Sequence, residues 1–216
     1  MSEADHETAA AGAGFWEPVA ILADLDGTLV DSVASSERAW AAFARRRGLE
    51  EEETHQFAMG RPTRETVALL VPEAERDAEQ GQIDRDEVGD ADSVVAYPGA
   101  AELLAGPVPI AIVTSGSTAL ATARLRGAGL EPPAVLITAD AITRGKPDPE
   151  PFLLGARGLG VDPLRCLALE DAPPGIASAR AAGMPVVAFR TTHPDAELED
   201  ATLVLDTLAE AVARLT

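Results

Sequence analysis

The 216-residue chain contains a single cysteine, Cys166, so an intramolecular disulfide is excluded. This scarcity fits a reducing compartment, and we expect a cytoplasmic location. Cys166 stands in the apolar run 164–169, which predicts a small buried side chain rather than a reactive thiol. The sequence has no apolar run long enough to cross a bilayer, and its first residues carry acids without a basic cluster. Neither a membrane partner nor a signal peptide is therefore expected.

Positive charge is scarce as well. The chain has 17 Lys and Arg against 36 Asp and Glu, which gives a formal net charge of −19. Binding to nucleic acid depends on Lys and Arg that neutralise phosphates, so a nucleic-acid partner is not expected. An acidic soluble surface is the plainer interpretation. We expect a monomer or a weak dimer.

From Pro18 onward the chain alternates short apolar runs with helical patterns. The apolar runs are typical of strands buried on both faces of a sheet. They are Val19–Asp24, Ile110–Thr114, Val135–Thr138, Leu167–Glu170, Val186–Phe189 and, more weakly, Leu203–Leu205. The helical patterns are Thr118–Arg126, Pro149–Leu159, Gly175–Ala182 and Leu208–Leu215. Gly127 and Gly183 are expected as helix C-caps. This alternation predicts an α/β fold, a Rossmann-like doubly wound parallel sheet with helices on both faces.

The segment 33–96 breaks the alternation, because it contains no convincing strand. Trp40 and Phe43 share one face of a helical pattern, and the charge-dense stretch 73–92 is typical of a solvated helical face. A connection of this length must form a structure of its own, which we interpret as an all-helical cap. The predicted organisation is a disordered tail at 1–17, a core made of 18–32 and 97–216, and an inserted cap at 33–96.

Polar residues follow the predicted strands, at the edge where an open parallel sheet binds ligands. They form four clusters, at Asp24–Thr28, Thr114–Gly116, Gly145–Pro149 and Glu170–Asp171. The chain must turn after Asp24, and Gly27 permits that turn. Carboxylates of Asp24, Glu170 and Asp171 at neighbouring strand ends would repel one another. A cation is therefore expected among them, and their hard oxygens suit Mg²⁺.

Lys146 is the only lysine, and the other sixteen basic residues are arginines. A compact ammonium group can approach phosphate and carboxylate as a point charge where a planar guanidinium would not fit. The hydroxyl of Thr114 and the backbone N–H groups from Ser115 onward could hold phosphate oxygens where a helix begins. The same Thr-Ser-Gly-Ser run could also form an ordinary N-cap.

These residues carry a family resemblance. The stretch Asp24-Leu-Asp-Gly-Thr-Leu-Val-Asp-Ser32 resembles the first motif of the haloacid dehalogenase superfamily. Thr114, Lys146 and the pair Glu170-Asp171 match its second, third and fourth motifs in order. The resemblance extends over nearly the whole chain from about Pro18, with the inserted segment at the position of that family's helical cap. Residues 137–189 are especially similar to the sugar- and polyol-phosphate phosphatases of this group.

The resemblance implies a phosphatase of small phosphate monoesters, with a small phosphorylated metabolite such as a sugar or polyol phosphate as its partner. Asp24 would attack phosphorus and form an aspartyl phosphate. Asp26 would protonate the leaving oxygen and later activate water. Mg²⁺ would be held by Asp24, the backbone carbonyl of Asp26 and Asp171, with Glu170 assisting. Thr114, Ser115 and Lys146 would bind the phosphate oxygens.

In the cap, Met59-Gly60-Arg61-Pro62-Thr63-Arg64 resembles the family's substrate-facing loop. Arg61 and Arg64 are therefore candidate contacts to substrate hydroxyls or phosphate, although either could be a solvated arginine. His55 and His193 have no identifiable partner in the sequence, and we interpret both as surface residues.

Alternatives remain within and beyond this family. Dehalogenating members lack the second Asp of the first motif, so Asp26 favours phosphoryl chemistry. Phosphonate-cleaving relatives use a cap lysine, and this cap has none. A β-phosphoglucomutase-like mutase stays open, although Ser35-Ser36-Glu37 stands where such mutases place a His. A signalling receiver domain would need neither the cap nor Asp26, and a non-catalytic binding protein would not need the full catalytic set.

Overall fold

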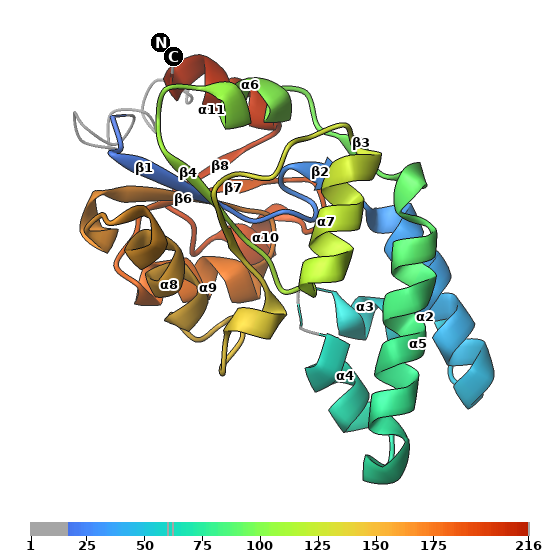
Figure 1. The fold of residues 1–216 in the computed structure, drawn as a ribbon. Coiled ribbons are helices and arrows are strands. Elements are labelled where there is room, and N and C mark those ends of the chain that lie inside the picture. Colours follow the sequence, from blue (N-terminus) through green and yellow to red (C-terminus); the bar gives the residue numbers. More distant parts are fainter. Residues whose placement is uncertain (1–16, 60, 62, 216) are drawn as a thin grey trace.

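The computed structural model describes residues 17–215 except residues 60 and 62 (Figure 1). The tail expected at 1–17 therefore lies outside the described residues, apart from Glu17. Six parallel strands form one sheet, in the order β5-β4-β1-β6-β7-β8. They are β1 (Ala20–Ala23), β4 (Ile110–Val113), β5 (Val135–Ile137), β6 (Cys166–Glu170), β7 (Val186–Phe189) and β8 (Leu203–Leu205). All six strands expected from the apolar runs are confirmed, each to within two residues.

Strand β1 lies in the middle of the sheet, with β4 on one side and β6 on the other. The chain proceeds from β1 outward through β4 and β5, and then returns to β6 and continues in the opposite direction. The order of the strands thus reverses between β1 and β6. In doubly wound sheets this reversal opens a crevice at the carboxyl ends of the strands, and ligands bind there.

Successive residues of β1 contribute to different hydrophobic cores, because side chains of a strand alternate between its two faces. Ile21 and Ala23 belong to one core, and Ala20 and Leu22 belong to the other. The first core is covered by α6 (Ala100–Ala105), α7 (Thr118–Gly127) and α11 (Leu208–Leu215). The second is covered by α8 (Glu150–Leu159), α9 (Pro173–Ala181) and α10 (Asp195–Leu198). Cys166 is buried in this second core, as expected.

The expected helices α7, α8, α9 and α11 are confirmed, whereas the short helices α6 and α10 were not anticipated. The prediction of Gly127 as a C-cap is wrong, because α7 includes Gly127 and the left-handed residue after it is Gly129, with φ of 70°. A Cβ at position 127 would lie 2.1 Å from the carbonyl oxygen of Ala91. Gly127 thus permits close packing. Gly183, with φ of 85°, does lie just beyond the end of α9.

Four helices form a separate layer, which we call the helical insertion (Figure 1). They are α2 (Val33–Arg47), α3 (Glu51–Ala58), α4 (Thr63–Leu70) and α5 (Arg76–Gly89). Trp40, Phe43 and Ile83 lie at the centre of the insertion's own hydrophobic core. Short 3-10 turns are η1 (Glu73–Glu75), η2 (Ala91–Ser93), η3 (Ala139–Ala141) and η4 (Pro163–Arg165).

A two-stranded antiparallel ribbon connects the helical insertion to the sheet. Its strands are β2 (Val30–Asp31) and β3 (Val95–Ala96). Strand β3 was not foreseen, because two residues are too short to produce a recognisable pattern. The ribbon holds the two ends of the insertion side by side, so that the chain leaves and re-enters the core at one place.

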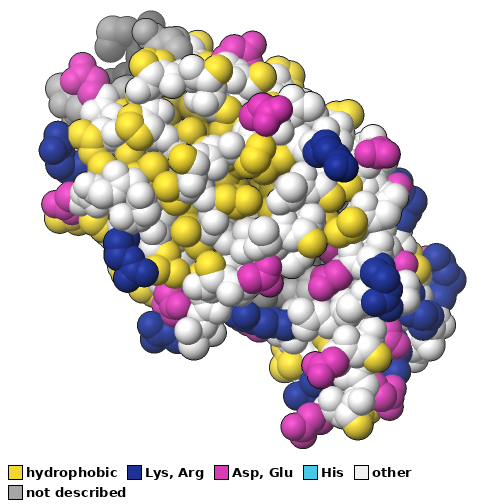
Figure 2. Space-filling model, in the orientation of Figure 1, with side chains coloured by type: hydrophobic (Ala, Val, Ile, Leu, Met, Phe, Trp, Pro, Cys, Tyr) yellow, Lys and Arg dark blue, Asp and Glu magenta, His cyan; other side chains and the backbone are white. Residues whose placement is uncertain are grey.

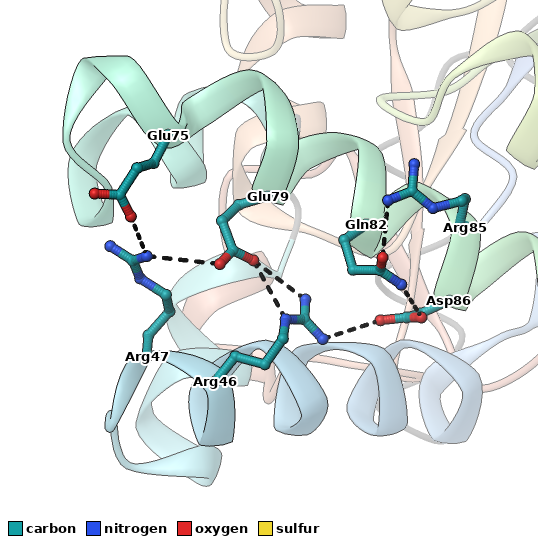
Figure 3. A network of polar contacts seen from close by, with 7 residues as sticks. All are labelled: Arg46, Arg47, Glu75, Glu79, Gln82, Arg85 and Asp86. Atoms are coloured by element: carbon teal, nitrogen blue, oxygen red, sulfur yellow. Dashed lines mark hydrogen bonds and ion pairs between the residues drawn. The ribbon is translucent and has the colours of Figure 1, made fainter.

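Ion pairs join α2 to α5 and to the turn η1 that precedes it (Figure 3). Arg46 reaches Glu79 at 3.3 Å and Asp86 at 3.2 Å, and Arg47 reaches Glu75 at 2.5 Å. Figure 2 shows basic and acidic side chains mixed over this part of the molecule. The expectation of a solvated charged face at 73–92 holds for Glu75, whose side chain is 52% exposed, whereas Glu79 and Asp86 are only partly exposed. It is wrong for Glu87, which is only 3% exposed.

Candidate active site

Four polar side chains converge where β1 and β6 end. Asp24 follows β1, Glu170 ends β6, Asp171 comes next, and Lys146 lies in the loop between β5 and α8. The ammonium nitrogen Nζ of Lys146 lies 2.5 Å from Asp24 Oδ1 and 2.5 Å from Glu170 Oε1. All four residues are buried. These side chains meet at the carboxyl ends of β1 and β6, between which the strand order reverses. An open α/β sheet binds its ligands at such a place.

Two glycines allow this close approach. Gly27, in the turn after Asp24, has φ of 80°, and a Cβ there would lie 2.2 Å from Asp171 Oδ2. A Cβ at Gly175, in the first turn of α9, would lie 2.0 Å from Glu170 Oε1. Any larger residue at either position would displace one of the acids. These glycines therefore set how tightly the carboxylates can cluster.

The acidic cluster of Asp24, Glu170 and Asp171 has the chemistry of a site for a hard divalent cation. Each residue offers a carboxylate oxygen, and these oxygens lie within 4.8 Å of one another. If all three carboxylates ionise, the ammonium group of Lys146 balances only one of them and leaves two negative charges in a buried space. Oxygen ligands with excess negative charge are what magnesium and similar ions require.

The ionisation of the cluster reflects this imbalance. Burial raises the pKa of Asp24 to about 8, although Lys146 opposes the shift. Burial and the neighbouring Asp24 raise the pKa of Asp171 to about 7. The pKa of Glu170 is also raised, mainly by burial. Burial alone would lower the pKa of Lys146, but its two carboxylate partners outweigh burial and raise it. The ammonium group therefore stays charged, while the carboxylates need a further cation to ionise fully.

Two threonines hold Asp171 in place, and neither of them was connected with that residue from the sequence alone. The hydroxyl of Thr28 donates to Asp171 Oδ1 at 3.4 Å, and the hydroxyl of Thr192 donates to Asp171 Oδ2. Thr28 lies within the first motif, Asp24–Ser32, whereas Thr192 lies beyond β7 and is distant in sequence. Nothing in the sequence pointed to Thr192, because only folding brings it beside Asp171.

The loop after β4 faces the same space. Thr114 is buried, and its Oγ1 accepts a hydrogen bond from the backbone N–H of Gly116 at 3.1 Å. Ser117 is the N-cap of α7, and its Oγ accepts from the N–H of Leu120 at 3.3 Å. The capping function considered for this run therefore belongs to Ser117, while Thr114 and Ser115 line the cavity described next.

A cavity extends from this cluster to the helical insertion. From the core it is lined by Asp24, Asp26, Thr114, Ser115, Lys146 and Asp171. From the insertion it is lined by Ser36, Trp40, His55, Met59, Arg61 and Glu87. The structure thus brings the predicted polar residues of four loops to one cavity, and the helical insertion forms its opposite wall.

The two candidate arginines of the insertion are placed differently. Arg61 lines the cavity, with its guanidinium 4.4 Å from the centre of the Phe57 ring and Nη1 donating to the Phe57 carbonyl at 2.9 Å. Arg64 is not among the lining residues. Its Nη1 donates to the carbonyl of Ala139 in the core at 3.1 Å. Only Arg61 is positioned to meet a molecule in the cavity.

The interpretation of both histidines as surface residues is wrong for His55 and holds only in part for His193. His55 is 6% exposed and faces the cavity from α3, and burial lowers its pKa. His193 is half-buried and also lines the cavity, with Nδ1 2.8 Å from the hydroxyl of Thr192. The tertiary arrangement of the insertion over the sheet edge brings both side chains to the cavity, and a single sequence does not reveal that arrangement.

Asp26 is held by groups that sequence reasoning did not connect with it. Ser32, at the N-cap position of α2, makes no capping bond, and its Oγ donates to Asp26 Oδ1 at 2.7 Å. Nη1 of Arg124, on α7, forms an ion pair with the same oxygen at 2.8 Å. A signal for Arg124 did exist, because it shares the buried stripe of α7 with Leu120 and Ala121. A charged residue on an apolar stripe indicates a buried partner.

Comparisons with known proteins agree with this architecture. The family model of haloacid dehalogenase-like hydrolases matches residues 19–183. Hexitol phosphatase A of Escherichia coli is 41% identical over 88% of this chain and 91% of its own. Fructose-1-phosphate phosphatase YqaB of E. coli is 31% identical over 79% of this chain and 95% of its own. The crystal structure of CbbY from Rhodobacter sphaeroides in complex with phosphate superposes with a TM-score of 0.80 at 25% identity. That superposition covers 92% of this chain and 99% of CbbY. The chain belongs to the haloacid dehalogenase-like hydrolase family.

Proposed function

We propose that this protein is a Mg²⁺-dependent phosphatase that hydrolyses small phosphate monoesters, sugar or polyol phosphates in particular. The observation that carries the proposal is the buried contact of Lys146 with Asp24 and Glu170, beside Asp171 and open to a cavity. A carboxylate next to an ammonium and a set of hard oxygen ligands suits attack on a phosphoryl group.

In the proposed reaction, a carboxylate oxygen of Asp24 attacks phosphorus and the bond from phosphorus to the ester oxygen breaks. Asp26 gives its proton to the departing alkoxide, so an alcohol leaves and an aspartyl phosphate remains. Asp26, now a carboxylate, takes a proton from water as that water attacks the same phosphorus. Inorganic phosphate then leaves, and the Asp24 carboxylate is restored.

The remaining residues bind and stabilise the phosphoryl group. Lys146 and Thr114 would contact its oxygens, together with the backbone N–H groups from Ser115 onward. When Mg²⁺ is bound by Asp24, the Asp26 carbonyl and Asp171, with Glu170 assisting, it neutralises charge on the phosphoryl oxygens. Thr28 and Thr192 keep the Asp171 carboxylate oriented for this purpose.

The substrate class is inferred from the opposite wall of the cavity and from the relatives. Ser36, His55 and Arg61 present hydroxyl, imidazole and guanidinium groups from the helical insertion. Such donors suit the hydroxyl groups of a sugar or polyol. The names of the two E. coli relatives, hexitol phosphatase and fructose-1-phosphate phosphatase, point to the same class. We further propose that helices α2–α5 act as a cap that excludes water from the covalent step.

The alternative function, a phosphosugar mutase, has less support. A mutase must return the phosphoryl group to a sugar. The start of α2 carries Ser35, Ser36 and Glu37 in place of the His that was expected of mutases. The 41% identity to a hexitol phosphatase favours hydrolysis.

No described helix is long and apolar enough to span a membrane.

Phosphate release tests the proposal. The purified protein would be incubated with hexitol, sugar and nucleotide monophosphates, with Mg²⁺ and with EDTA, beside Asp24→Asn. We expect Mg²⁺-dependent release that is greatest for hexitol or sugar phosphates and absent in the variant. If none of these substrates yields phosphate, or if the variant retains the rate, the proposal is wrong. Transfer of phosphate from a bisphosphate primer to a sugar would instead support the mutase.

A further inference from the structure

A buried arginine connects Asp26 with the helical insertion. Arg124 lies on α7 in the core, with Nη1 2.8 Å from Asp26 Oδ1. On the other side, its Nη2 donates to Oε1 of Glu87, on α5 of the insertion, at 2.9 Å. The side chains of Arg124 and Glu87 are each 5% exposed. The guanidinium of Arg124 thus connects Asp26, the proposed acid and base, with Glu87 on a helix of the insertion. Glu87 lies 37 residues before Arg124 in the chain.

The contacts of Asp26 explain what this connection can do. Ser32 and Arg124 both contact Oδ1. Two groups on one oxygen restrict rotation of the carboxylate, so proton transfer would fall to Oδ2. Positioning of this kind matters for a general acid, because a misplacement of about 1 Å can reduce the rate about 100-fold.

Stability alone does not explain why Arg124 is buried between Asp26 and Glu87. Buried ion pairs contribute little net stability, because the desolvation of both charges offsets their attraction. Arg124 also leaves Nε without a hydrogen-bond partner among the described residues, although that atom is buried. The cost of burying this group is not offset by a complete set of hydrogen bonds. A residue buried at this cost in the wall of the cavity points to a role in the chemistry.

We propose that Arg124 is a positioning residue that orients Asp26 for proton transfer, and that Glu87 makes this orientation depend on the seating of α5 against α7. The inference rests on the proposed phosphatase function. When the insertion is seated, Glu87 holds one end of the guanidinium, and the other end holds Asp26. If the insertion moves away, Arg124 loses that partner and Asp26 loses a fixed orientation. Closure of the cavity and readiness of the acid would thus occur together.

The leaving group provides a test that separates positioning from stability. kcat/KM reports the steps up to loss of the alcohol, and an alkyl phosphate needs a proton from Asp26 in those steps. An aryl phosphate such as p-nitrophenyl phosphate has a weakly basic leaving group and needs that proton far less. For Arg124→Met we expect kcat/KM for a hexitol phosphate to fall about 10- to 100-fold. The fall for p-nitrophenyl phosphate should be less than about threefold. Arg126→Met, on the exposed side of the same helix, should leave both values unchanged.

Further variants guard against misfolding. In Arg124→Met/Glu87→Met the buried pair is replaced by two apolar side chains, a change that often restores stability. We expect this double variant to regain the wild-type Tm while its selective loss on alkyl phosphates persists. Glu87→Gln should show a smaller loss of the same selective kind, and Arg124→Lys should recover part of the activity of Arg124→Met.

Specific outcomes would overturn the inference. If Arg124→Met loses kcat/KM equally on both substrates, or if activity returns in the double variant together with Tm, Arg124 is structural only. Wild-type activity in Glu87→Gln would remove the link to the insertion. If the wild-type protein itself releases no phosphate from any substrate, the failure lies in the proposed function and not in the role of Arg124.

Discussion

The ammonium nitrogen of Lys146 lies 2.5 Å from Oδ1 of Asp24, and the Lys146 side chain is only 4% exposed. The same nitrogen contacts Glu170, so it neutralises part of the charge of two carboxylates at once. In a chain whose other basic residues are all arginines, this position demands a small cation. A guanidinium is planar and wider than an ammonium group, and it would force the carboxylates apart.

Lys146→Arg is therefore expected to reduce kcat at least about 100-fold, although the charge is retained. The cause would be displacement of Asp24 and Glu170, so Mg²⁺ binding should weaken as well. The measurements are steady-state phosphate release and a Mg²⁺ titration by calorimetry. Arg144→Lys, in the same loop on an exposed side chain, is the control and should behave as wild type. Activity of Lys146→Arg within about threefold of wild type would refute the argument from size.

Asp24→Asn should abolish turnover while the fold remains intact. Asn has the shape of Asp but is a much poorer nucleophile, so no aspartyl phosphate can form. Burial disfavours the charged form of Asp24, and removal of that charge should therefore not lower stability. In EDTA we expect the Tm of the variant to be within about 5 °C of the wild-type value. Residual activity above the background of a mock preparation would contradict the assignment of Asp24 as nucleophile.

Gly27→Ala should damage the site far more than its change in size suggests. The position has φ of 80°, which costs a non-glycine residue about 1 kcal/mol. The added Cβ would also lie 2.2 Å from Asp171 Oδ2, so the carboxylate must move. We expect activity and Mg²⁺ affinity to fall at least about tenfold.

Gly48→Ala is the matched control for this substitution. Gly48 has φ of 67°, but a Cβ there would meet nothing within 4 Å. Its Tm should fall by a few degrees because of the backbone conformation, while kcat stays at the wild-type value. Equal activity in the two variants would show that the approach of Gly27 to Asp171 has no functional importance.

The sequence predicted those parts of the fold that depend on neighbouring residues in the chain. Strands such as β1 and β6 are uninterrupted apolar runs, and Lys146 stands out because no other lysine competes with it. Thr192 was missed because its partner Asp171 is distant in sequence, and His55 was misjudged because the cavity that it lines is built from distant segments. Gly127 was misassigned for a related reason. Its close approach to Ala91 is a tertiary contact, and the sequence offered only the local interpretation of a helix cap.

The pH dependence of stability should follow from the raised pKa values of the acidic cluster. In the folded protein the pKa of Asp24 is raised to about 8 and that of Asp171 to about 7, in both cases mainly by burial. Between 3.8, the ordinary pKa of an aspartate side chain, and these raised pKa values, the folded state binds more protons than the unfolded state. Stability must therefore decrease as pH rises through this window. Without metal, we expect the Tm to be lower at pH 8 than at pH 5.5.

Magnesium should reverse this trend, because it binds the deprotonated carboxylates and displaces their protons. The increase in Tm caused by Mg²⁺ should therefore be small at pH 5.5 and several-fold larger at pH 8. Thermal unfolding with EDTA and with Mg²⁺ at the two pH values measures both effects. In Asp171→Asn the Mg²⁺-dependent increase should be lost, and the decline of Tm with pH in EDTA should be shallower. A Mg²⁺ effect of equal size at both pH values, or one that persists in Asp171→Asn, would mean that the ion stabilises the protein from another place.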